Sequence, residues 1–387
     1  MNFVSKGERR THCVVCQGAQ LSSIVVTPPV PVYQGCVDTA LGDDISEPME
    51  WQVCEACGSA QLANALPLEL VYQGAHATGL GGAWDLHHKT FASFVAKHRR
   101  GEVLEVGGGG GKLARFFRAE EPEPGWHILE PNPTLIGDAI PGVHLVRGFL
   151  DEDVSIPDQV ETLVFCHCLE HIYNIGEIVA VMAAKLPFGG RVILAWPDLE
   201  KWIVRGEPGA LNWEHTFFCS VATLTSLFEK NGFRLAEKAA FGKDHSVFLA
   251  LTKSETVQTP SPPESDFEAV RSQIGEYFAQ FARKATALNA RARESGRPVF
   301  AAPASIYTQY LFAFGLDPGL VTGLIDNSPL KQGRRLYGTP LQVLPSTALE
   351  ETASTVILNG GAHNVEMAAR FRRENPQTDI ILAAEVS

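Results

Sequence analysis

The feature that most constrains the fold is a run of five glycines that follows an apolar segment. The apolar segment spans residues 103–106, the glycines occupy residues 107–111, and a helix-like segment begins at Lys112. Glycine lets the backbone approach a ligand that a Cβ would block, and it adopts positive φ where a turn needs it. Gly107, Gly109 and Gly111 are therefore predicted to form a cofactor-binding turn between a strand and a helix.

Further short apolar segments alternate with helical spacers up to about residue 252. They cover residues 127–130, 162–165 and 191–195, and such alternation favours βαβ units and a mostly parallel sheet. A second α/β set follows at residues 299–302, 320–326, 354–358 and 379–382. The predicted fold class is α/β, with a central Rossmann-like sheet, a small N-terminal module and a C-terminal Rossmann-like α/β domain.

Changes in composition give the domain boundaries. Residues 1–70 are rich in Cys, Pro and Gly and form a loop-rich module too small to be stable by core burial alone. The central domain is predicted at residues 71–252, a Pro-rich linker at 253–266, and the C-terminal domain at 267–387, which opens with a long helix over residues 267–294.

Composition and charge exclude several classes of partner. Apolar residues make up 45% and charged residues 20% of the chain, and the net charge is −12, which argues against binding nucleic acid. No apolar run is long enough to span a bilayer, and residues 1–10 lack the apolar core of a signal peptide. The predicted location is the cytoplasm, without membrane attachment.

Four of the eight cysteines form two Cys-x-x-Cys pairs, Cys13 with Cys16 and Cys54 with Cys57. A two-residue gap lets both thiolates of a pair reach one Zn²⁺ ion, which takes four ligands in a tetrahedron. A redox dithiol and unrelated thiols are the alternatives. Four cysteines complete a closed shell, so the predicted zinc ion is structural.

Two carboxylates accompany the glycine run. Glu105 precedes the first glycine by two residues, and Glu130 ends the next apolar strand, where a carboxylate can accept hydrogen bonds from both hydroxyls of a ribose. A nicotinamide-binding domain would share these features. The sequence from His167 to Ile172, with its Leu-Glu-His-Ile ending, resembles the end of the fourth strand in class I methyltransferases. The resemblance implies that S-adenosylmethionine (SAM) binds at Glu105, the glycines, Glu130 and His167.

The whole chain resembles the bacterial three-domain sugar methyltransferases that C-methylate nucleotide-linked 4-keto deoxysugars. That family has an N-terminal zinc-binding domain, a class I methyltransferase domain and a C-terminal α/β domain. The matching stretches lie at residues 54–62, 104–111, 168–172, 214–218, 325–333 and 337–340. The resemblance implies a nucleotide sugar as the small-molecule substrate. The chain is expected to be a monomer or small homo-oligomer.

The resemblance also implies the catalytic groups. C-methylation beside a ketone needs a base that removes the α-proton, and imidazole suits this task near neutral pH. The family's base matches His215, with Glu214 beside it and His171 as a second participant.

One departure from the family bears on the acceptor. The family has Tyr-His before Glu-His, whereas this chain has Asn212-Trp213. Either Tyr72, Tyr173 or Tyr307 replaces the missing tyrosine, or the enzyme is an O-methyltransferase acting on a hydroxyl, which needs no enolate stabilisation. A non-catalytic nucleotide-sugar-binding scaffold is the alternative from another class.

Three further histidines remain open at this point. His87 and His88 lie near Trp84, and adjacent side chains point in different directions, so at most one of them faces a site. His245 belongs to Asp-His-Ser, either a solvated turn or a substrate contact.

Overall fold

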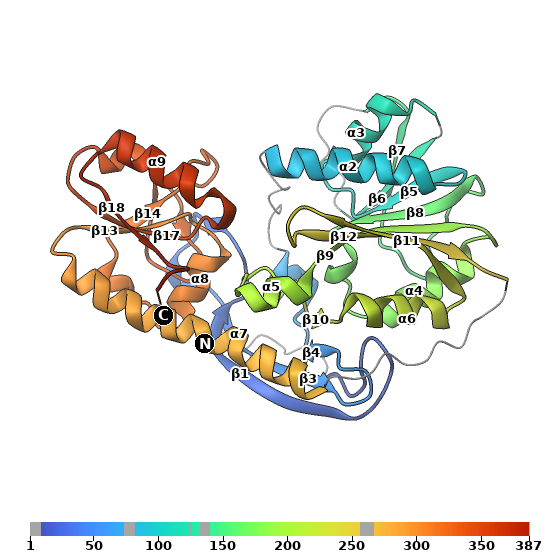
Figure 1. The fold of residues 1–387 in the computed structure, drawn as a ribbon, viewed down its shortest axis with the longest axis horizontal. Coiled ribbons are helices and arrows are strands. Elements are labelled where there is room, and N and C mark those ends of the chain that lie inside the picture. Colours follow the sequence, from blue (N-terminus) through green and yellow to red (C-terminus); the bar gives the residue numbers. More distant parts are fainter. Residues whose placement is uncertain (1–8, 73–81, 124, 132–139, 256–266, 387) are drawn as a thin grey trace.

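The computed structural model describes residues 9–72, 82–123, 125–131, 140–255 and 267–386. In this part of the chain the strands form sheets of seven, five and four strands and one two-stranded ribbon. Figure 1 shows the seven-stranded sheet on the right, the five-stranded sheet on the left, and the N-terminal strands with a long helix below both.

The seven-stranded sheet has the order β11-β12-β9-β8-β5-β6-β7. Only β12 runs antiparallel to its neighbours, β9 and β11. Its strands are β5 (Glu102–Val106), β6 (Trp126–Glu130), β7 (Val143–Arg147), β8 (Val160–Cys166), β9 (Arg191–Pro197), β11 (Phe233–Phe241) and β12 (Ser246–Lys253). The sheet reverses beside β5, so ligands are expected beyond the carboxyl ends of β5 and β8.

Helices cover both faces of this sheet (Figure 1). One face carries α2 (Gly82–His98) and α3 (Lys112–Glu120), and the other carries α4 (Ile175–Lys185) and α6 (Val221–Lys230). A doubly wound sheet of this order, with a single antiparallel strand beside its edge, is the class I methyltransferase fold. The predicted α/β fold class is confirmed.

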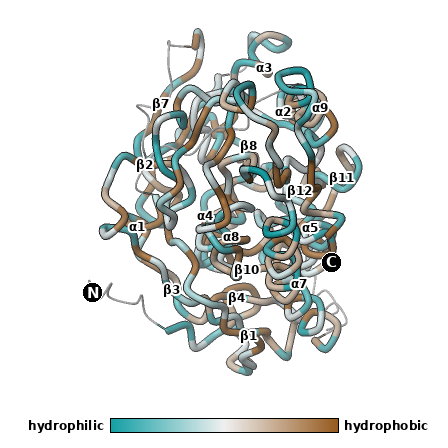
Figure 2. Tube along the Cα trace, turned by 90° about the vertical axis from the view of Figure 1, so that its left-hand side faces the viewer, coloured by the Kyte–Doolittle hydropathy of each residue, from teal (hydrophilic) through white to brown (hydrophobic). Residues whose placement is uncertain are grey.

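The four-stranded sheet has the order β1-β3-β4-β10. Three of its strands come from the N-terminal segment and the fourth comes from the middle of the chain: β1 (Leu21–Pro31), β3 (Ser46–Cys54), β4 (Ala60–Leu62) and β10 (Phe217–Phe218). In Figure 2 the tube is brown, and thus hydrophobic, around β4 and β10. This sheet therefore joins residues that lie more than 150 positions apart.

The five-stranded sheet is wholly parallel, in the order β16-β14-β13-β17-β18. Its elements are β13 (Val299–Ala302), α8 (Ile306–Ala313), η4 (Pro318–Leu320), β14 (Gly323–Ile325), β16 (Val343–Leu344), η5 (Ser346–Leu349), β17 (Thr355–Leu358), η6 (Gly361–His363), α9 (Asn364–Glu374) and β18 (Asp379–Leu382). The remaining short elements are β2 (Cys36–Val37), η1 (Leu41–Asp43), α1 (Leu68–Val71), η3 (Leu169–His171), α5 (Leu199–Arg205) and β15 (Arg335–Leu336).

A long helix, α7 (Phe267–Glu294), ties the three sheets together, and its bounds match the predicted helix. It packs on β1, β3, α5 and α8. The ring of its Phe278 lies 6.2 Å from that of Trp51 on β3. One cluster of buried apolar side chains runs from the N-terminal sheet through the α4 and α6 side of the large sheet to α8. The N-terminal strands are thus packed into the body of the protein.

The N-terminal and C-terminal segments also meet in a short ribbon, in which β2 pairs with β15. Arg335 donates two hydrogen bonds to the carboxylate of Asp44 at 2.5 and 2.6 Å, and the Tyr337 hydroxyl accepts a hydrogen bond from the amide of Ile45 at 2.6 Å. Bidentate guanidinium–carboxylate pairs are strong and directional. They fix the orientation of the two segments.

Sequence patterns predicted the central strands closely and the N-terminal strands poorly. The predicted strand at residues 320–326 is shorter in the structure, because residues 318–320 form a 3₁₀ turn and only 323–325 pair. Residues 256–266, most of the predicted linker, lie outside the described residues. Among the described helices, none combines the length and apolar character needed to cross a membrane.

Candidate active site

The glycine run forms the turn from β5 into α3, as its sequence predicted. Gly107, Gly109 and Gly111 have φ of 71°, 49° and 69°. These values favour glycine. A Cβ on Gly107 would lie 2.4 Å from Sγ of Cys168, so this position also excludes any side chain sterically.

Two carboxylates flank this turn in different ways. Glu105 is buried beneath it and accepts a hydrogen bond from the indole nitrogen of Trp126 at 2.9 Å. Burial raises the pKa of Glu105 to about 8. Glu130 ends β6 and accepts a hydrogen bond from the amide of Gly109 at 3.1 Å. Glu130 therefore contacts the backbone of the turn directly, whereas Glu105 is buried beneath the turn.

His167 follows β8 and has an unusual backbone, with φ of 50°. Its Nε2 lies 2.9 Å from the Ser246 hydroxyl, and its Nδ1 lies 3.4 Å from a carboxylate oxygen of Glu170. Burial lowers the pKa of His167 to about 3 and raises that of Glu170 to about 7. The His167 ring is thus a neutral group beside the glycine turn.

The three predicted catalytic residues come together on two facing loops. Nε2 of His215 lies 3.3 Å from Nε2 of His171, and their ring centroids are 4.5 Å apart. Nδ1 of His171 lies 3.8 Å from a Glu214 carboxylate oxygen and 3.0 Å from the Tyr72 hydroxyl. The structure thus adds Tyr72, one of the three tyrosines proposed to replace the missing one, to the predicted set.

Burial controls protonation in this cluster. It raises the pKa of Glu214 to about 8 and lowers that of His215 to about 4. It also raises the pKa of the Tyr72 hydroxyl above its ordinary value. At neutral pH the His215 imidazole is therefore neutral and can accept a proton, while the Tyr72 hydroxyl keeps its hydrogen.

Asn212, which stands where the family has a tyrosine, has a local structural task. Its side-chain oxygen accepts hydrogen bonds from the amides of Glu214 and His215 at 2.8 and 3.0 Å. Its side-chain nitrogen donates to the carbonyls of Pro208 and Gly209, both at 3.3 Å. Asn212 therefore shapes the turn that presents the predicted base.

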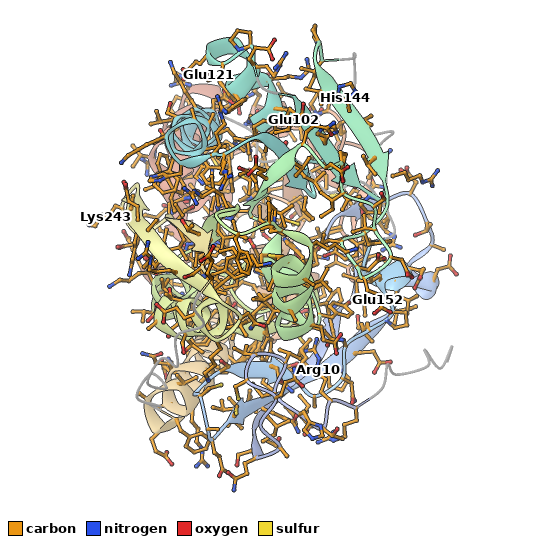
Figure 3. All side chains as sticks on the ribbon, turned by 90° about the vertical axis from the view of Figure 1, so that its right-hand side faces the viewer. Arg10, Glu102, Glu121, His144, Glu152 and Lys243 are labelled. Carbon is orange, nitrogen blue, oxygen red and sulfur yellow. The ribbon has the colours of Figure 1, made fainter. Side chains whose placement is uncertain are left out.

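The N-terminal segment, including its sheet, anchors both loops of this cluster. Thr216, next to His215, accepts a hydrogen bond from the amide of Leu62 at 2.9 Å, just before β10 joins β4. Arg10 donates to the carbonyl of Thr216 at 3.0 Å and to that of Tyr173, two residues beyond His171, at 2.9 Å. Figure 3 labels Arg10 on the N-terminal segment below the helices of the large sheet. One guanidinium thus bridges the two histidine loops.

The four paired cysteines form a second cluster, which includes Cys54 and Cys57 at the turn between β3 and β4. Their sulfurs all lie within 4.8 Å of one another. The two closest pairs cross between the motifs, with Cys13 3.7 Å from Cys57 and Cys16 3.5 Å from Cys54. Backbone amides of Val15 and Gly18 point at Cys13 and Cys16 at 3.4 Å.

Sequence reasoning missed Glu170 and left His87 and His245 open. Glu170 sits between His167 and the His171–His215 pair, and one of its oxygens lies within 4.8 Å of one nitrogen of each ring in that pair. Its position directly before His171 was a usable signal, but only the fold reveals that both neighbouring histidine groups approach it.

Comparison with known proteins supports this interpretation of the fold and cofactor turn. A family model described as a methyltransferase domain matches residues 83–238. The chain is 23% identical over 360 residues to the C-methyltransferase NovU of Streptomyces niveus, covering 86% of this chain and 85% of that protein.

Solved structures show weaker likenesses. Human N-acetylserotonin methyltransferase in complex with SAM has 10% identity and a TM-score of 0.38, covering 44% of this chain and 52% of the human one, about half its length. A SAM-dependent methyltransferase from Mesorhizobium loti has 11% identity and a TM-score of 0.35, covering 44% and 98%.

The chain is a SAM-dependent methyltransferase with a class I fold. The strand order, the family model over residues 83–238 and the relative that matches most of the chain agree on this class. The nicotinamide and binding-scaffold alternatives are therefore set aside.

Proposed function

We propose that this enzyme transfers a methyl group from SAM to a carbon atom of a nucleotide-linked keto deoxysugar, with His215 as general base. The observation that carries the proposal is the cluster formed by the buried His215 and Glu214 with the half-buried His171 and Tyr72. The printed name of the relative, a C-methyltransferase, supports carbon as the acceptor atom.

The cofactor turn fits SAM. A side chain at Gly107 would clash with Cys168, and the amide of Gly109 donates a hydrogen bond to Glu130. The Glu130 carboxylate can also accept hydrogen bonds from two ribose hydroxyls. When bound, SAM supplies an electrophilic methyl carbon on a positively charged sulfur. Gly107, Gly109, Gly111 and Glu130 would hold it, with His167 beside its methionine part and Glu105 supporting the turn.

His215 and Tyr72 divide the work on the acceptor. The neutral His215 nitrogen takes the proton from the carbon beside the ketone, and the electron pair left on that carbon forms the new bond to the methyl carbon. In this transfer the electron pair of the carbon–sulfur bond would stay on the departing sulfur. The Tyr72 hydroxyl, held at His171, donates to the developing enolate oxygen and fills the role of the tyrosine that Asn212 replaces.

An O-methyltransferase is the second candidate, favoured by Asn212 alone. Incubation with SAM and nucleotide-linked keto deoxysugars, followed by NMR of the product, separates the two. A methyl signal coupled to a ring carbon supports the proposal, whereas a methyl on oxygen refutes it. The Tyr72→Phe variant sharpens the test, because it should slow C-methylation while leaving SAM binding unchanged.

We also propose that Cys13, Cys16, Cys54 and Cys57 hold one structural Zn²⁺ ion. Sulfur–sulfur contacts of 3.5 and 3.7 Å fit a tetrahedral site, where about 2.3 Å Zn–S bonds give separations of about 3.8 Å. Amides that point at two of the sulfurs suit thiolates. The expected result is zinc in the purified enzyme, with one ion per chain fewer in Cys54→Ser; an unchanged zinc content in that variant contradicts the assignment.

A further inference from the structure

Three histidines from three separate segments lie close together at the strand ends of the large sheet, next to α2. His87 lies in α2, His167 follows β8 and His245 precedes β12. Their ring centroids are 5.0 Å apart for His87 and His167, 5.2 Å for His87 and His245, and 5.7 Å for His167 and His245. One nitrogen from each ring lies within 4.8 Å of the other two. The fold thus gathers three imidazoles from three separate segments.

His87 packs among aromatic rings, but its polar atoms have no evident task there. It is fully buried, and neither of its ring nitrogens has a hydrogen-bond partner among the described residues. The rings of Trp84, Phe241 and Phe248 surround it at 4.9 to 5.4 Å. Burying unpaired polar atoms is unfavourable, and an apolar residue would fill this position without that penalty. A ligand on a His87 nitrogen removes the penalty.

The other two rings already converge on one point. The Ser246 hydroxyl lies 2.9 Å from Nε2 of His167 and 2.5 Å from Nδ1 of His245. A hydroxyl carries one hydrogen, so it can donate to only one of these nitrogens. On the far side of its ring, His167 faces the Glu170 carboxylate at 3.4 Å. A carboxylate behind an imidazole is a common orienting partner of metal-binding histidines.

We propose that His87, His167 and His245 bind one divalent transition-metal ion. Imidazole nitrogens suit zinc, copper, iron and nickel, and three protein ligands leave a further position open. A formed tetrahedral site has nitrogens about 3.4 Å apart, so small rotations of the side chains complete it. His87 also lies within 4.8 Å of His88 and Cys166. The first trio is favoured because the Glu170 carboxylate lies behind one of its rings, 3.4 Å from Nδ1 of His167.

The trio lies where a bound ion could act on the methyl-transfer site. His167 is next to Cys168, whose sulfur bounds the Gly107 turn, and Glu170 lies between the trio and the His171–His215 pair. An ion here adds positive charge beside the methyl-transfer site, where it would stabilise negative charge on an acceptor oxygen. Binding of the ion does not depend on which acceptor the enzyme uses.

Cobalt titration of the full chain, purified without a histidine tag and stripped of metal, tests the proposal. The cysteine cluster and the histidine trio give different spectra, because only thiolate ligands add an intense charge-transfer band. We expect two Co²⁺ ions per chain, one of each kind. His87→Leu and His245→Leu should each lose only the ion without the thiolate band. Cys16→Ser should lose only the ion with that band, and the matched control His88→Leu should keep both ions.

Three outcomes overturn the proposal. In the first, wild-type protein binds a single ion, which shows the thiolate band. In the second, a second ion still binds to both His87→Leu and His245→Leu; in the third, its binding depends on His88 instead of His245. His245 is only half-buried, so its variant remains informative if His87→Leu fails to fold, and an intact thiolate band reports folding in each variant. If the zinc proposal alone fails, the thiolate band is missing while the second spectrum persists.

Discussion

The seven-stranded sheet and the N-terminal four-stranded sheet contribute differently to one active site. The large sheet is built from residues 102–253 alone, and its cofactor turn depends on contacts within that segment. The small sheet combines N-terminal strands with β10, and it anchors the loops of His171 and His215 through Leu62 and Arg10. The proposed cofactor site thus depends on one segment, whereas the geometry of the proposed base depends on distant segments.

The largest expected effect separates the two properties at the base itself. His215→Ala should lower turnover by about 10²- to 10⁴-fold, because it removes the group that accepts the proton. The affinity for S-adenosylhomocysteine should stay within about twofold of wild type, since the cofactor turn is untouched. Steady-state kinetics and calorimetry measure both values. The exposed His363→Ala is the control, and turnover near wild type in His215→Ala would refute the assignment of the base.

A smaller effect is expected on the cofactor side. Glu130→Gln should weaken binding of S-adenosylhomocysteine by about 10- to 100-fold, because a neutral amide is a weaker acceptor than a carboxylate for ribose hydroxyls. Calorimetry measures this loss, with the exposed Glu123→Gln as control. Equal affinities in the two variants would show that Glu130 does not contact the cofactor.

The smallest effect concerns pH and stability. Burial raises the folded-state pKa of Glu214 from an ordinary 4.5 to about 8. Between these values the unfolded chain loses its proton and the folded chain keeps it, so this group destabilises the fold progressively as pH rises. Glu214→Gln should therefore show a Tm advantage over wild type that grows from about pH 5 to about pH 8. The exposed Glu152→Gln serves as control, and a constant Tm difference would contradict the burial argument.

Local sequence was sufficient for the cofactor turn and the long helix. Five glycines after an apolar strand have few structural interpretations, and residues 267–294 carry a helical pattern that the structure follows from end to end. The cysteine pairs also came together as their spacing predicted. In each of these cases the informative residues are neighbours in the sequence or repeat at a regular period.

The remaining features depend on tertiary contacts without a local pattern. Nothing near Phe217 indicates that it extends a sheet started at Leu21, and nothing near Arg10 indicates its bonds to Tyr173 and Thr216. The identity of Asn212 suggested only a missing tyrosine, while its side chain in fact shapes the turn at Glu214 and His215. The role of the cysteine cluster and the division into domains at residues 70, 252 and 266 stay predictions.

The most direct test of the difference between the two sheets is Arg10→Met. This change keeps an apolar stem but removes the guanidinium that bridges the two histidine loops. Turnover should fall by up to about 100-fold, because a displacement of catalytic groups by about 1 Å can slow a reaction by that factor. The affinity for S-adenosylhomocysteine should stay within about twofold of wild type. The control is Arg9→Met, which removes an exposed ion pair with Glu50 on the same segment. Unchanged turnover in Arg10→Met, or an equal loss of turnover and cofactor affinity, would contradict the account.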